Sequence, residues 1–129
     1  MAAGIQIRKA HFPGRAPIDA YGEGGFRFAD MSHRGSILCL PSGIYGWEPG
    51  DPGLLAETDF ERVIAEAAQI EILLVGTGRD IRLLPAPLRE ALKQARIPVD
   101  PMSTGAAART YNVLLAEDRA VAAALVAVD

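Results

Sequence analysis

Polar side chains are concentrated around two turns of small residues in the second half of the chain. The first turn, residues 76–79, follows an apolar run that is typical of a buried strand, and the second, residues 103–105, precedes a helical stretch. Backbone N–H groups at such turns, together with arginine guanidiniums, can bind a phosphate or a carboxylate. We therefore expect both turns to open on one crevice that holds an anion or contacts a partner. The residues of this predicted crevice are Gly76, Thr77, Gly78, Arg79, Ser103, Thr104, Arg109 and Asn112.

The first turn matches no complete phosphate-binding motif. A dinucleotide-binding fingerprint would place a third glycine at position 81, which is Ile81, and the Lys-Ser/Thr ending of a P-loop is absent. The residues after the turn, 79–83, have the pattern of an extended or irregular segment rather than of a helix. A purely structural turn is therefore the favoured interpretation, and contact with an anion or another ligand is the alternative.

The second turn introduces the last of three expected helices. Ser103 or Thr104 can cap its first N–H groups, or those groups can stay available to an anion. Arg109 then has two interpretations: it joins Arg79 at an anion, or it pairs with the acidic residues 117–118 or with a strand carbonyl. We favour the second interpretation, because structural ion pairs are common.

Asn112 follows Tyr111, which we expect to be buried on the inner face of the same helix. The Asn112 amide is either a donor inside the crevice or a hydrogen-bonding group that holds the loop at Gly76. We favour the second role, so the sequence points to a structural use of this side chain.

A second candidate site is the aromatic pair Tyr45 and Trp47, which precedes a loop of prolines and glycines at 49–53. Aromatic side chains are enriched at the centres of protein interfaces, so the pair predicts a protein-contact patch. An equally supported interpretation is that the two rings cover one end of a sheet.

The chain has few residues suited to catalysis. Its two histidines, His11 and His33, have no cysteine or carboxylate at metal-ligand spacing, which argues against a metal site. Cys39 alternates with the leucines at 38 and 40 and is most simply a small buried hydrophobic residue. No Gly-x-Ser-x-Gly motif is present that would activate a serine. We therefore expect no catalytic residues, no metal and no cofactor.

The composition is that of a single globular domain. A chain of 129 residues can bury roughly two thirds of its unfolded surface, so residues 1–129 are expected to form one domain with a loose end at 1–4. A formal net charge of −3 argues against general nucleic-acid binding. No run approaches the ~20 apolar residues that span a membrane, and no secretory or mitochondrial leader is apparent. A single cysteine fits a reducing compartment, so we expect a cytoplasmic protein.

The first half of the chain reads as mostly β structure. Apolar and polar residues alternate with the period of two that is typical of strands. The glycines at 22–25 allow a tight reversal and predict a hairpin around them. The expected strands lie at 5–12, 18–21, 26–28, 35–40 and 44–47.

The second half alternates between helices and strands. Its first helix is expected to begin at a capping box formed by Thr58 and Glu61. Strands that alternate with helices imply parallel neighbours in a sheet that the helices cover. The sequence therefore predicts an α/β fold with an extra β layer from the N-terminal half. The elements that follow are a strand at 72–75, a helix at 85–95, a short extended segment at 97–99, a helix at 103–116 and a strand at 121–128, for which a helix is the competing interpretation.

Several of these segments share a family pattern. They are 18–22, 26–28, 36–38 before Pro41, 75–78, 102–114 and 117–119. Taken together, they resemble the domain family shared with mitochondrial respiratory complex I assembly factor 3. The likeness covers nearly the whole chain and is most specific at Arg109-Thr110-Tyr111-Asn112.

The resemblance implies a three-layer α/β domain with a central mixed β-sheet flanked by helices and an additional N-terminal β layer. It implies no established enzymatic activity, and the eukaryotic relatives take part in the assembly of respiratory complex I. Because this chain starts almost directly at the domain, without a mitochondrial leader, we expect it to be more like the bacterial members.

Two main classes of function follow from these observations. The leading hypothesis is a non-catalytic protein-binding or assembly-factor-like domain, linked to membrane-complex biogenesis, whose unidentified protein partner contacts the crevice or the Trp47 surface. The alternative is a small enzyme or carrier that binds an anionic metabolite in the crevice between Gly76 and Thr104. A third hypothesis is a purely structural subunit whose oligomer buries the Trp47 face.

Overall fold

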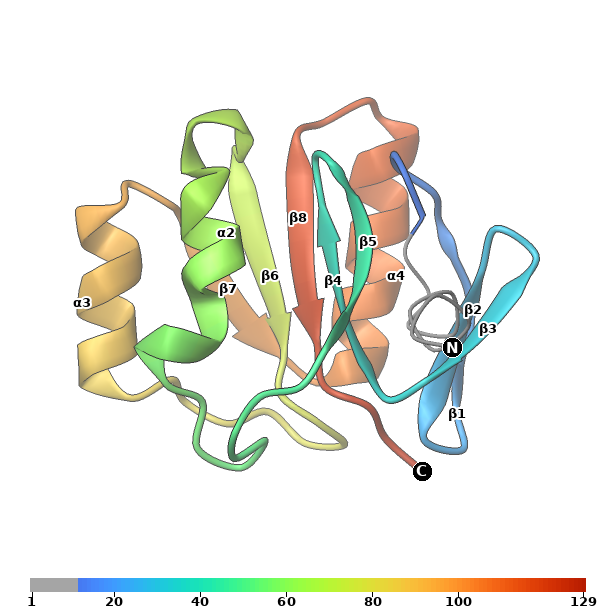
Figure 1. Cartoon of the computed structure of the whole chain (residues 1–129), viewed down its shortest axis with the longest axis horizontal. Coiled ribbons are helices and arrows are strands. Elements are labelled where there is room, and N and C mark those ends of the chain that lie inside the picture. Colours follow the sequence, from blue (N-terminus) through green and yellow to red (C-terminus); the bar gives the residue numbers. More distant parts are fainter. Residues whose placement is uncertain (1–11) are drawn as a thin grey trace, which may run out of the picture.

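A computed structural model gives the structure of residues 12–129 as three layers around a five-stranded sheet (Figure 1). The order across the sheet is β5 (Gly43–Trp47), β4 (Ser36–Leu40), β8 (Val121–Leu125), β6 (Ile72–Gly76) and β7 (Val99–Met102). β6 runs parallel to both β7 and β8, whereas β4 is antiparallel to β5 and to β8, so the sheet is mixed.

Helices cover both faces of this sheet. The helix α3 (Ala86–Gln94) connects β6 to β7, and the helix α4 (Thr104–Ala116) connects β7 to β8, which lies on the other side of β6. Because crossovers between parallel strands are right-handed, two steps in opposite directions place their helices on opposite faces. Figure 1 shows this arrangement, with α2 and α3 on one side of the sheet and α4 on the other. The helical segments are η1 (Glu57–Phe60), α2 (Glu61–Ala65), η2 (Ala67–Gln69), α3 (Ala86–Gln94) and α4 (Thr104–Ala116).

Alternation along the strands divides the core into two clusters. In β6, Leu73 and Val75 join Leu88 of α3 in a cluster on one face. Leu74, between them, joins Tyr111 of α4 in a cluster on the other face. Successive side chains of a strand point to opposite faces, and here both faces are covered. This is why the strand needs apolar residues at consecutive positions, as the sequence indicated.

The N-terminal half adds a three-stranded antiparallel sheet with the order β1 (Ile18–Gly22), β2 (Gly25–Phe28) and β3 (Met31–Arg34). Its inner face packs on the central sheet and α4 through residues such as Phe26 and Phe28, which are 2% and 0% exposed. The hairpin expected around the glycines at 22–25 is confirmed by the pairing of β1 with β2.

β3 was not predicted from the sequence. A two-residue turn, Ala29-Asp30, joins β2 to β3, and both residues have positive φ, at 49° and 61°. Such turns usually carry Asn-Gly, because a Cβ disfavours this backbone region. The strand itself contains mostly polar residues, and only His33 among them is buried. Tertiary packing therefore decides this element, and the local pattern does not.

The predicted α/β fold, with a central mixed sheet, flanking helices and an additional N-terminal β layer, is confirmed by this architecture. The last element is a strand, as favoured, although it ends at Leu125 rather than at residue 128. The expected strand at 5–12 and the loose end at 1–4 fall largely outside the described residues, and Phe12 forms an isolated bridge with Ile44. Across residues 12–129, no helix has the length and apolar character that crossing a bilayer requires.

The predicted capping box of Thr58 and Glu61 is wrong. The first helical turn begins earlier, at Glu57. The residue before it, Ala56, donates its N–H to the Asp59 carboxylate at 2.8 Å, so Asp59 is the acidic residue that closes the start of the turn. The same carboxylate accepts from the Gly50 N–H at 3.1 Å and so fixes the preceding loop. The Asp59 carboxylate binds the N–H groups of Ala56 and Gly50 and so fixes the start of this helical turn, a role that the sequence pattern had assigned to Thr58.

Candidate functional site

The turn after β6 and the first residue of α4 lie against each other. Two hydrogen bonds connect them: the Thr104 N–H donates to the Gly78 carbonyl at 2.8 Å, and the Gly78 N–H donates to Thr104 Oγ1 at 3.0 Å. Gly78 has a φ of 120°, a backbone conformation that side chains other than hydrogen disfavour. The two small-residue turns therefore meet, as their positions at the carboxyl ends of adjacent parallel strands required.

The C-terminal segment closes the same junction from a third side. The Thr104 hydroxyl donates to the Val126 carbonyl at 2.7 Å, and the Val126 N–H donates to the Gly76 carbonyl at 2.9 Å. Thr104 is fully buried, and a Cβ added at Gly76 would lie 2.8 Å from the Thr104 Cα. The junction is thus a close backbone crossing whose polar groups bond one another.

Thr77 shapes the loop that follows. Its hydroxyl accepts from the Arg82 N–H at 2.9 Å and lies 3.1 Å from the Asp80 carbonyl, while its own N–H donates to the Met102 carbonyl at 2.9 Å. At the other turn, the Ser103 hydroxyl accepts from the Ala106 N–H at 3.3 Å, which is the expected cap of α4. Both turns therefore use their hydroxyl groups internally.

The two arginines of the predicted crevice line different hollows. Arg79 is exposed beside a hollow of about 190 Å³, together with Asp80 and Arg82. Arg109 is exposed beside another hollow of about 330 Å³, between β1 and α4, together with Asn112. Within residues 12–129 neither guanidinium has an ion pair, so the pairing of Arg109 with residues 117–118 does not occur.

Asn112 holds β1 in place. Its Oδ1 accepts from the Ile18 N–H at 2.8 Å, and its Nδ2 donates to the Ile18 carbonyl at 2.8 Å. The favoured role at the loop of Gly76 is therefore wrong, because the amide points to the small sheet. β1 is the first strand of that sheet, and the amide supplies the donor and acceptor that a further strand would have supplied.

Trp47 packs inside the domain. Its indole is 7% exposed, its Nε1 donates to the Asp59 carbonyl at 2.9 Å, and its ring meets Phe60 edge-on with the centroids 5.4 Å apart. Tyr45 is half-buried: its hydroxyl lies 2.6 Å from Ser42 Oγ, and the Arg62 guanidinium lies 4.3 Å from its ring centroid. Of the aromatic pair, only Tyr45 reaches the surface.

The residues that the structure describes bring no catalytic set together. Burial raises the pKa of the Cys39 thiol to about 12, although a hydrogen bond with Tyr111 opposes this in part, so the nucleophilic thiolate is disfavoured at neutral pH. His33 is buried, and its Nε2 lies 3.2 Å from the Ser36 carbonyl. Within residues 12–129 no group of three or more His, Cys, Asp or Glu side chains is placed to hold a metal, and His11 falls outside that range.

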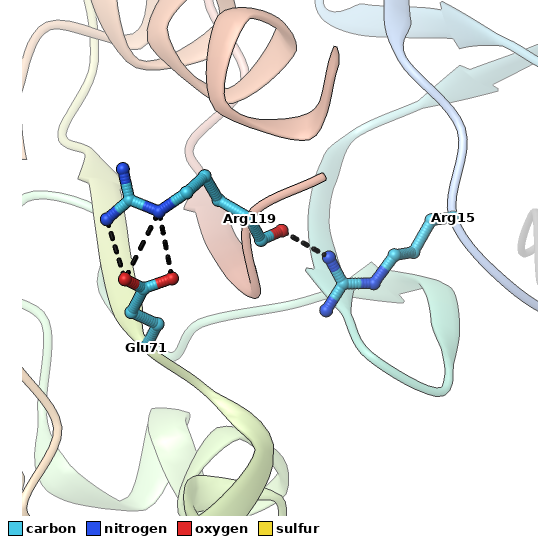
Figure 2. Close-up of polar contacts among 3 residues, drawn as sticks. All are labelled: Arg15, Glu71 and Arg119. Carbon is cyan, nitrogen blue, oxygen red and sulfur yellow. Dashed lines mark hydrogen bonds and ion pairs between the residues drawn. The ribbon is translucent and has the colours of Figure 1, made fainter. Parts of the chain in front are cut away.

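An ion pair at the opposite end of β6 was missed by the sequence analysis. Arg119 binds the Glu71 carboxylate through Nε and Nη2, with the shortest contact at 2.7 Å, and its backbone carbonyl accepts from Arg15 at 2.9 Å (Figure 2). The Arg119 guanidinium lowers the pKa of the Glu71 carboxyl, and Glu71 in turn raises the pKa of Arg119. Both side chains are nearly half exposed, so this pair joins three segments without forming a pocket.

Comparison with known proteins follows the same boundaries as the fold. A family model described as "protein of unknown function (DUF498/DUF598)" matches residues 18–126. A protein of Rhodobacter capsulatus that is described as uncharacterised is 42% identical over 118 residues, which are 92% of this chain and 90% of that protein.

A second relative has a described role. NADH dehydrogenase (ubiquinone) 1 alpha subcomplex assembly factor 3 of Mus musculus is 30% identical over 122 residues. The alignment covers 95% of this chain but 66% of the mouse protein, so this chain spans just under two thirds of that relative.

Solved structures show the same fold at higher identity. A crystal structure described as an outer membrane protein from Bartonella henselae is 65% identical, with a TM-score of 0.88, and the match covers 92% of this chain and all of that one. An NMR structure from Rhodopseudomonas palustris is 49% identical, with a TM-score of 0.79, over 92% of this chain and 87% of that one.

Proposed function

The chain belongs to the DUF498/DUF598 family, and from this premise we propose that it is a non-catalytic, protein-binding domain with an assembly-factor-like role in building a membrane complex. The observation that carries the proposal is the alignment with assembly factor 3 of the mouse, which covers 95% of this chain.

The geometry of the junction supports a binding role over a catalytic one. The N–H groups of Gly78 and Thr104 already have partners inside the protein. What remains at the surface is a rigid frame that presents Arg79 on one side and Arg109 on another. Arginine is enriched at the energetic centres of protein interfaces, so both guanidiniums are candidate contacts for a partner.

The binding role is tested by co-purification of the tagged full chain from its native cells. We expect partner proteins to be recovered with the wild type and to be reduced with Arg79→Ala or Arg109→Ala. Lys93→Ala, at an exposed position of α3, is the matched control and is expected to recover the same partners. Equal recovery by all four proteins would remove both arginines from the proposed interface.

The assembly role is tested separately, in cells that lack the protein. Native gels and NADH oxidation by isolated membranes measure how much respiratory complex is assembled. We expect less assembled complex in the deletion strain and full recovery when the wild-type chain is restored. An unchanged amount of complex would refute the assembly role, whatever the chain binds.

We also propose that the protein works in the cytoplasm. The reducing environment there suits Cys39, which is buried and free. The Bartonella henselae structure, however, is described as an outer membrane protein. Fractionation of native cells into cytoplasm, periplasm and membranes decides this point, and recovery in the outer-membrane fraction would overturn the proposal.

The alternative, a carrier or enzyme for an anionic metabolite, has less support because the N–H groups at the junction are bonded internally. A ligand that binds only the folded state raises the melting temperature with the logarithm of its excess over Kd. We expect flat melting temperatures across phosphate, nucleotides and carboxylates. A rise with one compound, abolished by Arg79→Ala, would favour the alternative.

A further inference from the structure

The outer face of the small sheet is polar and open. Strand register places Ala20, Arg27 and Ser32 side by side, and the next row contains Gly22, Gly25 and Arg34. Phe26 and Phe28, at the alternate positions of β2, point to the core. These six positions come from all three strands of a sheet whose inner face is anchored to the rest of the molecule. Ala20, Arg27, Ser32 and Arg34 are exposed, Gly22 is half-buried and Gly25 is buried.

A hollow of about 420 Å³ lies over this part of the sheet. Gly22, Gly25, Ala20 and Ser32 contribute to its lining, and their small side chains leave the backbone surface low. Arg27 and Arg34 also line the hollow. A volume of this size is that of a site for a ligand much larger than a single ion, since one water fills ~30 Å³ and compact ligand sites begin near ~300 Å³.

Two like charges lie next to each other on this face. Arg27 opposes Ser32 and Arg34 opposes Gly25, so the two arginines are diagonal neighbours across β2 and β3. Two positive charges on one face of a sheet repel each other, and an anion that binds both guanidiniums would offset this repulsion. In the part of the chain that the structure describes, neither guanidinium has an ion pair or a side-chain hydrogen bond. The carboxylate that lines the hollow, Glu23, lies on the turn between β1 and β2.

We propose that this face, the arginine face of β1–β3, binds an extended acidic segment of a protein partner. Two fork-shaped donors favour carboxylates. The residues that line the hollow come from β1, β2 and β3, so its occupant crosses several strands, which suits a segment of chain better than a single ion. Glu23 repels the acidic side chains of the bound segment, so these side chains are expected to lie at Arg27 and Arg34 and away from the β1–β2 turn. The site stands on its own geometry, whereas the statement that its occupant belongs to an assembly partner rests on the proposed function.

NMR titration of the ¹⁵N-labelled full chain tests the site. The probe is a synthetic peptide of alternating glutamate and alanine, acetylated and amidated, and the matched control peptide has glutamine in place of glutamate. We expect shifts confined to residues 20–34 and to the Arg27 and Arg34 Nε–H signals, for the acidic peptide only. High salt is expected to reduce them, because exposed charge pairs are screened.

Variants define the charges responsible. Arg27→Ala and Arg34→Ala are each expected to weaken binding roughly tenfold, as the loss of a charge-assisted hydrogen bond requires. Glu23→Gln is expected to tighten it. Lys93→Ala, an exposed cation on α3, is expected to bind as the wild type does. Dispersed spectra establish that each variant is folded.

Three results would overturn the proposal. One is no localised shift at millimolar peptide, and another is equal affinity of Arg27→Ala and the wild type. The third is that inorganic phosphate produces the same shifts at the same concentrations, which would make the face a small-anion site. The peptide titration can fail while the deletion strain still loses its complex, so this site and the assembly role are refuted independently.

Discussion

Asn112 acts as a substitute for a strand at the outer edge of β1. Its amide bonds both backbone groups of Ile18, a residue that is 5% exposed. Asn112→Ala would leave a donor and an acceptor without partners in a mostly buried place. We expect the free energy of unfolding to fall by about 1–3 kcal/mol, the usual cost of unsatisfied buried groups. Urea denaturation followed by circular dichroism measures this change.

Two further variants control for the loss of side-chain bulk. Asn112→Asp keeps the acceptor for the Ile18 N–H but turns a carboxylate oxygen toward the Ile18 carbonyl, so it should be at least as destabilising as Asn112→Ala at neutral pH. Arg109→Ala, an exposed change on the same helix, should have almost no effect. If Asn112→Ala unfolds at the wild-type urea concentration, the amide contributes nothing to holding β1.

Because Cys39 is buried, we expect the free energy of unfolding to fall as the pH rises into the alkaline range. Burial in the folded state raises the pKa of the Cys39 thiol to about 12, whereas the thiol of an unfolded chain has a pKa of about 8.5. The unfolded state therefore loses its proton first, so this contribution is complete below about pH 8.5 and is lost as the pH rises toward 12. Between pH 9 and 10.5, the wild type should lose up to about 1.4 kcal/mol per pH unit relative to Cys39→Ala. Parallel pH profiles of the two proteins would show that the thiol does not titrate in this way.

At the scale of elements, the crossing of β6 over the start of α4 depends on Gly76. A Cβ there would meet the Thr104 Cα at 2.8 Å and Leu125 Cδ2 at 3.0 Å, and the first of these is backbone. Gly76→Ala should therefore destabilise the fold by about 1–3 kcal/mol, as other overpacked sites do.

Gly105→Ala is the matched test of that argument. A Cβ at residue 105 would overlap the Tyr21 hydroxyl, but this is the far end of a side chain that is 43% exposed and can turn away. Because alanine also favours helix over glycine, we expect Gly105→Ala to remain within about 1 kcal/mol of the wild type. Thermal or urea unfolding of the two variants side by side decides whether backbone contact is what matters.

The elements that carry the junction could be predicted from local patterns. Consecutive apolar residues gave β6, and a serine before an alanine-rich stretch gave α4 with its cap. The separation of Arg109 from Arg79 could not be anticipated from those patterns. Arg109 lies five residues after Thr104 in α4. At 3.6 residues per turn, its side chain therefore leaves the helix roughly 140° away from that of Thr104, which contacts the turn after β6. It therefore faces β1 instead of the loop after β6.

Other features of the site depend on contacts that are distant in sequence. Asn112 forms hydrogen bonds with Ile18, which is 94 residues away in the sequence, and Arg119 binds Glu71, which is 48 residues away. No spacing rule links such residues, because the loops between them set the geometry. β3 could not be predicted for a different reason. The turn before it has positive φ at Ala29 and Asp30, and this pair is not one of the residue pairs that usually indicate a tight hairpin turn.

At the scale of the whole molecule, the central sheet is shared by two cores. The cluster with α2 and α3 contains Trp47, and the cluster with α4 and the small sheet contains Cys39 and Tyr111. Strands β4, β6 and β8 contribute alternate residues to both clusters, so neither can lose its packing while the other stays intact. The expectation of a single domain therefore has a direct thermodynamic test.

We expect residues on both faces to unfold together. Trp47 fluorescence reports the first cluster, and the reaction of the Cys39 thiol with a chromogenic disulfide reports the second. Measured against urea with far-ultraviolet circular dichroism, the three signals should give one midpoint and one slope, as two-state unfolding requires. A Cys39 thiol that reacts at lower urea than the Trp47 transition would show that α4 and the β1–β3 layer open as a separate unit. In that case the arginine face would belong to the less stable part of the molecule, and its binding of an acidic segment should stabilise that part first.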